Sequence, residues 1–398
     1  MDEQEIANLV ARRIPGHSLE QAFYRDATIY ERDIQRIYLR SWLYAGHQSE
    51  IPKTGNFFLF NFAGESVIVI RSKDDKISAL INVCRHRGSR VCLEARGKVS
   101  RFTCLYHGWT YALDGRLCAA SSMPESFDKA EVALKAIHLE LFDGMIFVNF
   151  AADPVPFEPI KKDLGNCLRP YRLDKAKVAH RESYPIAANW KLAVENYSEC
   201  YHCAPAHPEY SLGHGLAMPE EKYTSLLTDV MARADACGLS GETVNADFQL
   251  AAAVGNDRSY ERYPLIRGHV TGSRTGKPVA PLLGDISEYD GGATDFQIGP
   301  VTFALAYCDH VVLYRFTPLS VDSTDCDITW LVHENAEEGK DYEVKELTWL
   351  WDVTTIADQH IIERNQAGVN SRFYEPGPYS LMEDFTARFV DWYLETIK

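Results

Sequence analysis

The chain has 398 residues and a mass of 45.0 kDa, which is more than one ordinary domain and predicts two or three. Hydrophobic residues make up 46% of it and charged residues 24%, a balance that supports a packed core and excludes a disordered chain. Lys and Arg number 41 against 56 Asp and Glu, so the net charge is −15. This charge argues against a nucleic-acid partner, because binding phosphates requires clustered positive charge.

The sequence also bears on location. No stretch approaches the ~20 consecutive apolar residues that cross a bilayer as a helix, so we predict no membrane span. The first residues, Met1 to Glu5, are acidic and lack the basic start and apolar run of a signal peptide. The ten cysteines are too sparse for a disulfide framework in a chain of this length and suit a reducing compartment. We therefore expect a cytoplasmic protein.

In chain order, the first elements are helical and then change to strands. Apolar residues such as Ile6, Leu9 and Val10 recur at helical spacing in the first forty residues. From about residue 51, short apolar runs alternate with turn residues, which is typical of an antiparallel β unit. Its predicted strands cover residues 57–60, 67–70, 77–81, 102–104, 110–113 and 145–148.

A linker with three prolines, residues 151–159, separates this β unit from a region of mixed helices and strands. The weakest pattern in that region is 235–292, which is rich in glycine and polar residues. We expect Gly368 to end the long C-terminal helix, and the last helix to open at Ser380 with capping-box spacing. Predicted helices cover 159–171, 189–202 and 343–366, and predicted strands cover 301–307, 311–317 and 327–332.

The first chemical motif lies in the β unit. It consists of Cys84-x-His86 and, after seventeen intervening residues, Cys104-x2-His107. Two thiolates and two imidazoles could bind zinc tetrahedrally or a [2Fe–2S] cluster, with two Cys on one iron and two His on the other. Zinc fingers usually pair Cys with Cys and His with His along the chain. Here each loop supplies one of each, which favours the Rieske [2Fe–2S] arrangement.

The second motif follows Asn189 on a predicted helix that ends before Pro205. Glu199 and His202 are three residues apart and share one face of that helix, and His207 can fold back from the turn after it. Two histidines and one carboxylate form the facial site of non-haem Fe(II) enzymes, which leaves positions free for oxygen.

The sequence alone leaves the carboxylate of this site open. Glu199 is nearest to the histidines in the chain. Asp358 is the rival, because it stands among apolar residues midway along the long C-terminal helix, although it could equally be a solvated residue paired with Arg364. We interpret Cys200 and Cys203, which interleave with His202, as packing residues, and we interpret Cys92 and Cys118 beside the first motif in the same way.

At this point the sequence resembles a known family. The two Cys–His pairs, the run Asn189-Trp190-Lys191 and the pattern Glu199-x2-His202-x4-His207 are similar to those of Rieske non-haem iron oxygenase α subunits, also called ring-hydroxylating oxygenases. The resemblance extends over nearly the whole chain. It implies an α+β protein with an all-β Rieske domain and a helix-grip catalytic domain built on an antiparallel sheet. The implied segments are 1–40, helical and packed on the catalytic domain, 41–150, the Rieske domain, and 151–398, the catalytic domain.

The resemblance also implies roles for the site residues. Asp358 would complete the iron site with His202 and His207, and Asn196 would line it. Glu199 would link His202 to His107 of the partner subunit and so carry electrons across the interface, in a homotrimer arranged head to tail.

The resemblance further implies a reaction and its electron source. Electrons from NAD(P)H would pass through a separate flavin and ferredoxin-type reductase to the cluster, then to a mononuclear Fe(II) that activates O2. No complete G-x-G-x-x-G or P-loop stands in this chain, which agrees with a separate reductase.

The substrate expectation rests on a departure from the family pattern. Aromatic-ring dioxygenases usually carry Asp where this chain has Glu199, and Glu resembles the branch that acts on quaternary ammonium compounds. We therefore expect N-demethylation of a betaine, proline betaine or carnitine-type compound. The alternatives are hydroxylation of an aromatic ring or aromatic acid by the same machinery and, from another class, a Rieske protein that only transfers electrons.

Overall fold

The computed structural model describes residues 1–215, 218–241, 243 and 257–398. Part of the glycine-rich region predicted to be weakly structured lies outside the described residues. The chain divides into two compact units, one formed by 44–154 and the other by 1–43 together with 155–398. The boundaries expected at residues 40 and 150 lie three and four residues before those of the units.

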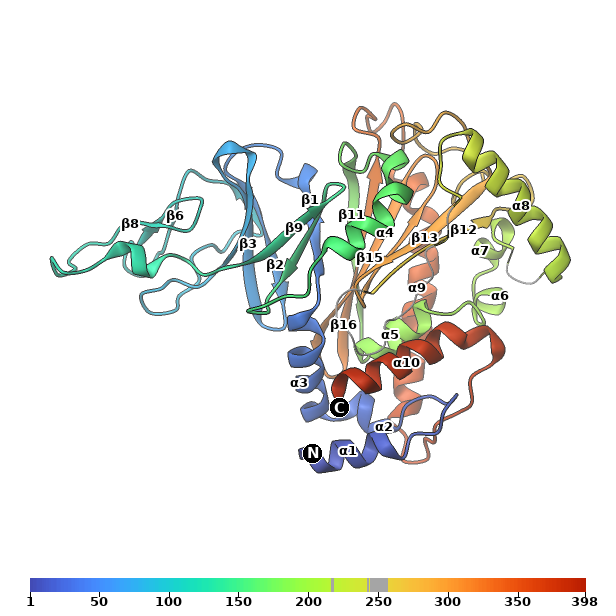
Figure 1. Cartoon of the computed structure of the whole chain (residues 1–398), viewed down its shortest axis with the longest axis horizontal. Coiled ribbons are helices and arrows are strands. Elements are labelled where there is room, and N and C mark those ends of the chain that lie inside the picture. Colours follow the sequence, from blue (N-terminus) through green and yellow to red (C-terminus); the bar gives the residue numbers. More distant parts are fainter. Residues whose placement is uncertain (216–217, 242, 244–256) are drawn as a thin grey trace. The chain divides into compact units, whose positions relative to one another are not determined.

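The smaller unit is all-β. Its main sheet has seven strands in the order β1-β10-β9-β4-β3-β2-β5, and a three-stranded sheet, β6-β7-β8, lies beside it in the chain's blue to teal part (Figure 1). The strands of the main sheet are β1 (Leu43–His47), β2 (Asn56–Phe62), β3 (Glu65–Arg71), β4 (Ile77–Ile81), β5 (Arg96–Lys98), β9 (Ala136–Phe142) and β10 (Met145–Asn149). Those of the small sheet are β6 (Phe102–Thr103), β7 (Thr110–Tyr111) and β8 (Leu117–Ala119).

The strands predicted in this unit are confirmed as β2, β3, β4, β6, β7 and β10. The sequence did not indicate β1, β5, β8 and β9. β5 and β8 have only three residues each and β1 contains Gly46 and His47, so none of these shows a clear pattern, whereas β9 alternates apolar and polar residues over 137–141 and was missed. β1 and β9 lie on either side of β10, whose residues are all buried, so tertiary contacts stabilise them.

The larger unit is built on a six-stranded antiparallel sheet in the order β11-β16-β15-β14-β13-β12. The predicted α+β class, with an all-β unit followed by an antiparallel sheet and helices, is therefore confirmed. These strands are β11 (Lys177–Ile186), β12 (Arg258–Pro264), β13 (Gly292–Ile298), β14 (Thr302–Ala306), β15 (Val311–Ser320) and β16 (Ser323–Val332).

A long helix, α9 (Val344–Val369), packs against β11 and against two shorter helices, α5 (Trp190–Tyr197) and α7 (Pro208–Gly213) (Figure 1). The remaining helices are α1 (Glu3–Ala11), α2 (Gln21–Arg25), α3 (Ala27–Arg36), α4 (Glu158–Leu168), α6 (Cys203–Ala206), α8 (Glu220–Ala236) and α10 (Asp384–Ile397). Among the described residues, no helix combines the length and the apolar character that a membrane span requires.

Two predicted helix boundaries are wrong and one is confirmed. The helix expected over 189–202 ends at Tyr197, and Pro205 lies inside the following short helix α6. Gly368 lies within α9, which ends at Val369 with Asn370 as its C-cap. The capping box is present, because Ser380 accepts a hydrogen bond from the backbone and Glu383 reaches back to the N–H of Ser380, 2.6 Å away.

A buried ion pair anchors helix α5 to helix α3. Lys191 and Asp33, both with no exposed side-chain surface, are bonded to each other. Asp33 also accepts hydrogen bonds from the Trp190 indole N–H at 3.0 Å and from the Tyr393 hydroxyl at 2.8 Å. Both oxygens of the carboxylate thus accept from a donor, three donors in all, which offsets part of the cost of burying the charges. The pair fixes α5 between α3 and α10 and so fixes the segment that follows it.

Candidate metal centres and substrate pocket

The two Cys–His loops of the β unit have the same backbone design. Gly88 donates its N–H to the carbonyl of Cys84 at 3.0 Å, and Gly108 donates to the carbonyl of Cys104 at 2.9 Å. Both glycines have positive φ, 79° and 72°, which other residues rarely adopt. Each loop therefore turns sharply enough to present its Cys and its His from the same tight turn.

The four predicted ligands of the first motif come together. The thiols of Cys84 and Cys104 are free and buried in one apolar cluster, 2% and 1% exposed. The Nδ1 atoms of His86 and His107 lie 3.1 Å apart on the exposed side of the loops. Two buried thiols and two imidazoles with adjacent Nδ1 atoms are the donor set of a Rieske [2Fe–2S] cluster, with Cys on one iron and His on the other.

One interpretation beside this motif is wrong. Cys92 packs in the same apolar cluster, 8% exposed, as expected. Cys118 is exposed and lies on the small strand β8, where its thiol points to the carbonyl of Arg116. The short three-residue strand leaves it outside the core, so it is not a packing residue.

The second set of ligands also converges. The Nε2 atoms of His207 and His202 lie 2.9 Å and 3.2 Å from Oδ1 of Asp358. One ligand atom from each of the three residues lies within 4.8 Å of the other two. Asp358 comes from the middle of α9, whereas the histidines flank α6. The fold thus brings together His207 and Asp358, which are 151 residues apart in the chain. Two imidazoles and one carboxylate fit the facial set that holds non-haem Fe(II).

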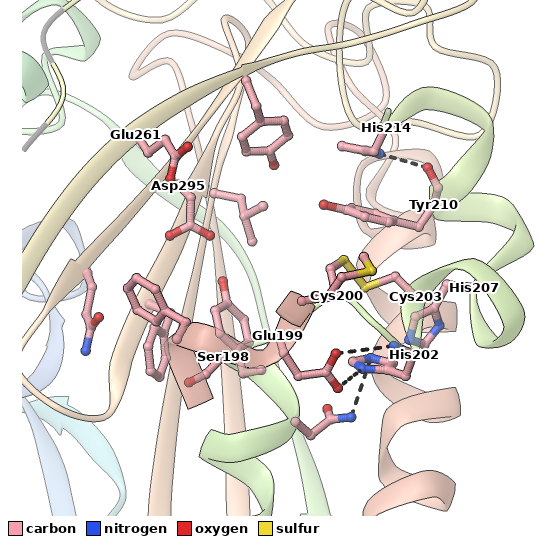
Figure 2. A pocket seen from close by; sticks show the side chains of 18 of the residues that line it. Ser198, Glu199, Cys200, His202, Cys203, His207, Tyr210, His214, Glu261 and Asp295 are labelled. Carbon is pink, nitrogen blue, oxygen red and sulfur yellow. Dashed lines mark hydrogen bonds and ion pairs between the residues drawn. A yellow bond between two sulfur atoms is a disulfide. The ribbon is translucent and has the colours of Figure 1, made fainter. Parts of the chain in front are cut away.

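Glu199 occupies a different side of the same histidine. Its Oε1 lies 2.6 Å from Nδ1 of His202 (Figure 2), while Nε2 of His202 faces Asp358. A carboxylate that accepts from Nδ1–H fixes the ring orientation and leaves Nε2 free to ligate a metal. Nδ2 of Asn196 lies 3.5 Å from that Nε2, so Asn196 also borders the site. In this geometry Asp358, and not Glu199, faces both histidines.

The structure corrects how Glu199 and His202 meet. They do not share a helix face, because α5 ends at Tyr197 and residues 198–202 form a turn. The Glu199 side chain accepts hydrogen bonds from the backbone N–H groups of Tyr201 and His202. These bonds satisfy backbone donors that the ended helix leaves open, which stabilises the turn and brings the carboxylate to the imidazole.

Cys200 and Cys203 form a disulfide, so their interpretation as two packing residues is wrong. The turn brings their Cα atoms to 4.9 Å, within the range that a disulfide spans. Cys200 and Cys203 line the pocket beside the histidines (Figure 2).

The electrostatics of this centre attract a positive charge. Burial lowers the pKa of His202, but hydrogen bonds to Asp358 and Glu199 outweigh burial and raise it to about 9. Burial raises the pKa of Asp358, but the two histidines lower it more. Nδ1 of the buried His207 lies 3.6 Å from Glu209, too far for a hydrogen bond.

The three groups open into a cavity of about 550 Å³. Its far wall is one face of the sheet, where alternate residues of β12, β13 and β14 point inward. Sequence reasoning did not find this wall, because it depends on strand register. The aromatic residues lining the cavity are Tyr197, Tyr210, Tyr223, Tyr263, Phe303, Tyr314, Trp351 and Phe385, and its carboxylates are Glu199, Glu261, Asp295, Asp358 and Asp384.

Comparison with protein families decides the identity. The Rieske [2Fe–2S] domain model matches residues 41–135, and the model of the ring hydroxylating alpha subunit (catalytic domain) matches residues 173–398, more than half of the chain. The chain belongs to the ring-hydroxylating oxygenase α-subunit family. As a member, this oxygenase is an O2-dependent oxidoreductase with a Rieske cluster and a mononuclear iron, and the predicted family is confirmed.

Relatives support the same assignment over almost the full length. The oxygenase is 37% identical to the glycine betaine monooxygenase oxygenase subunit of Pseudomonas aeruginosa strain UCBPP-PA14, over 98% of this chain and 91% of the relative. It is 32% identical to the carnitine monooxygenase oxygenase subunit of Escherichia coli K12, over 51% of this chain and 56% of the relative. Because both relatives are oxygenase subunits, a separate reductase is the electron source, and the substrate is a small molecule.

Solved structures show the same fold. The quaternary ammonium Rieske monooxygenase CntA with L-carnitine matches with a TM-score of 0.72 and 21% identity, over 100% of this chain and 99% of that one. Naphthalene 1,2-dioxygenase from Rhodococcus sp. matches with a TM-score of 0.68 and 19% identity, over 99% and 97%. At these identities the match establishes the fold of the oxygenase alone. The substrate must be inferred from the residues of the pocket.

Proposed function

We propose that this oxygenase hydroxylates an N-methyl group of a quaternary ammonium compound and thereby demethylates it. The observation that carries the proposal is the pocket, which adjoins the histidines and Asp358 and combines aromatic rings with carboxylates. The names of the relatives, glycine betaine and carnitine monooxygenase oxygenase subunits, agree with it.

The aromatic walls suit a ligand that cannot donate hydrogen bonds. A quaternary ammonium has no N–H group, so a protein binds it through ring faces and negative charge, at about 0.5–2 kcal/mol per ring. Tyr197 stacks on Phe303 with ring centroids 4.4 Å apart and contacts Tyr314 at 5.2 Å. Trp351 lies 6.0 Å from Tyr314 and continues the same aromatic surface. These packed rings form a rigid apolar surface next to the iron ligands.

The chain's own residues would position the reaction. His202, His207 and Asp358 would hold iron, and Glu199 would orient His202 through Nδ1. When bound, the iron supplies the site at which O2 is activated with electrons from the cluster. In the overall reaction, O2, two electrons and two protons convert N–CH3 to N–CH2OH and water. The hydroxymethyl product then loses a proton and breaks its C–N bond, which releases formaldehyde and the demethylated amine.

We further propose a homotrimer in which Glu199 links His202 to His107 of the partner subunit. The loop that carries His107 supports this arrangement, since Leu105 and Tyr106 beside it are 82% and 54% exposed. Large apolar side chains at a loop tip are typical of a surface that contacts another chain. Sedimentation of the holoenzyme should give three copies of the chain. A monomer that still turns over substrate would contradict the shared electron path.

The substrate proposal is tested by turnover of the holoenzyme with a Rieske-oxygenase reductase and NADH. Glycine betaine, carnitine, proline betaine and choline are screened for formaldehyde release, with naphthalene and benzoate as aromatic controls. We expect stoichiometric formaldehyde from at least one quaternary ammonium compound. Ring diols from the aromatic compounds instead would support the aromatic alternative. Iron and sulfide analysis should show two irons and two sulfides for the cluster and one further iron; a preparation that holds the cluster alone and cannot be loaded with the further iron would support an electron-transfer protein.

A further inference from the structure

Two carboxylates face each other on the sheet wall of the pocket. Glu261 of β12 and Asp295 of β13 are directly paired in the antiparallel register, so their side chains lie on the same face of the sheet. Both line the cavity. Figure 2 shows them on the opposite side of the cavity from Glu199 and His202.

This pair is unusual because nothing on the sheet balances it. Like charges directly opposite each other destabilise adjacent strands. The other cross-strand neighbour of Asp295 is Leu305. In the part of the chain that the structure describes, neither carboxylate has a hydrogen-bond or ion-pair partner. Arg388, the Arg that lines the described pocket, is bonded to Asp384 at 2.7 Å.

The groups around the pair leave it negative. Burial and the charge of Glu261 raise the pKa of Asp295 to about 7, and burial also raises the pKa of Glu261. Burial lowers the pKa of His214, across the cavity, to about 3, so this imidazole is neutral. Burial raises the pKa of each of the surrounding phenols, so these are neutral too: Tyr197, Tyr210, Tyr223, Tyr263 and Tyr307. At neutral pH the pair therefore carries one to two negative charges and faces the cavity without a counter-ion.

We propose that Glu261 and Asp295 are specificity-determining residues of this pocket, which select a cationic substrate whose end remote from the reacting methyl group is a hydroxyl or an amine. A substrate that carries a carboxylate at that end is disfavoured. This inference rests on the proposed function, because the iron ligands then fix one N-methyl group at the near side of the cavity.

The physical reason is charge complementarity across the pocket. A trimethylammonium group between the aromatic rings is attracted by the pair, and a hydroxyl or amine beyond it can donate to the carboxylates. Glu261 is exposed and Asp295 is half-buried at this wall, and a carboxylate in the same place meets their like charge and is repelled by it. The two carboxylates thus favour cationic ligands that end in a hydroxyl or an amine, and they disfavour ligands that end in a carboxylate.

The test compares choline with glycine betaine, which differ by a hydroxymethyl group in place of a carboxylate. Both are titrated calorimetrically into the anaerobic holoenzyme, so that no turnover occurs. We expect choline to bind at least tenfold more tightly than glycine betaine at pH 7.5. Equal affinity, or tighter binding of glycine betaine, would overturn the inference.

Variants then assign the preference to the pair. In Asp295→Asn with Glu261→Gln we expect the choline preference to fall at least tenfold. The matched control is Glu182→Gln, which removes a carboxylate from an exposed position of β11 in the same sheet and should keep the preference. A double variant with an unchanged preference, or a control that loses it equally, would show that the pair does not discriminate.

The pH dependence of the unmodified holoenzyme gives an answer even where the variants fold poorly. Because Asp295 loses its proton near pH 7, the ratio of choline to glycine betaine affinity should rise at least threefold between pH 6 and pH 8. A ratio that stays constant would contradict the inference. Formaldehyde release separates the two proposals. If quaternary ammonium compounds are demethylated but choline is not preferred over glycine betaine, the proposed function stands and only the role of Glu261 and Asp295 in specificity is refuted.

Discussion

Replacing Asp295 with asparagine should stabilise the ligand-free protein at alkaline pH. In the folded state, burial and Glu261 raise the pKa of Asp295 from 3.8 to about 7. A raised carboxyl pKa means that the folded state binds the proton more tightly than the unfolded chain does. Stability is therefore lost as the pH rises from about 4 to about 7, and the loss is complete above it. An amide at this position cannot ionise and avoids the loss.

The size of the effect follows from the shift. Each unit of pKa corresponds to about 1.4 kcal/mol, so a shift of three units corresponds to about 4 kcal/mol at most. Because Asp295 is partly exposed to the pocket, solvent screens part of this energy, and we expect a gain of about 2–4 kcal/mol at pH 8.5. For a unit of this size that is a rise of several degrees in the thermal midpoint. At pH 4 the gain should nearly vanish.

The assay is calorimetric unfolding of ligand-free holoenzyme at pH 4, 6, 7 and 8.5, with Glu182→Gln as the surface control. The control should change the midpoint by less than a degree at every pH, since an exposed carboxylate contributes little. Combining Asp295→Asn with Glu261→Gln should add less than the sum of the two, because each relieves the same repulsion. A variant that is no more stable than the wild type at pH 8.5, or equally stabilised at pH 4, would refute the reasoning.

Three further changes test the centres and the core. Asp358→Ala should remove the single iron while keeping the iron and sulfide of the cluster, as measured by metal analysis; full iron occupancy would show that Asp358 is not a ligand. Glu199→Gln should keep both centres yet slow reoxidation of the reduced cluster at least tenfold in stopped-flow experiments with substrate and O2, and an unchanged rate would remove Glu199 from the electron path. Lys191→Met leaves Asp33 charged and buried without its ion pair, so the free energy of unfolding should fall by about 3–5 kcal/mol, and a loss below 1 kcal/mol in denaturant titration would contradict this account of α5.

The sequence was sufficient where the chemistry is local. The cluster motif consists of two pairs of closely spaced residues, and each pair sits in a turn that a following glycine makes possible. The strands around it alternate clearly enough to be predicted. The pairing of His202 with His207 was also local, because only four residues separate them. Asp358 could be named as a candidate from its apolar surroundings, but its choice over Glu199 needed the resemblance.

The rest depends on tertiary structure. The helix that begins at Asn189 continues in its sequence pattern to His202, yet side-chain bonds from Glu199 to the backbone end it early. The same turn brings Cys200 and Cys203 together, which helical spacing alone does not reveal. Glu261 and Asp295 stand in separate strands 34 positions apart, and only the register between β12 and β13 makes them neighbours.

The stability cost and the proposed selectivity have one origin, the energy of placing negative charge on the pocket wall. If so, a bound cation should remove most of the cost. Saturating choline should then raise the unfolding midpoint of the wild type at pH 8.5 by more than that of Asp295→Asn, and the difference should approach the gain that the variant shows without ligand. Glycine betaine should restore less of it, because its carboxylate meets the same charge. A protein that retains such a pair in its sheet trades fold stability for discrimination between ligands. Agreement between the energy measured by unfolding and the energy measured by ligand binding would distinguish a binding surface from an accidental pair of acids.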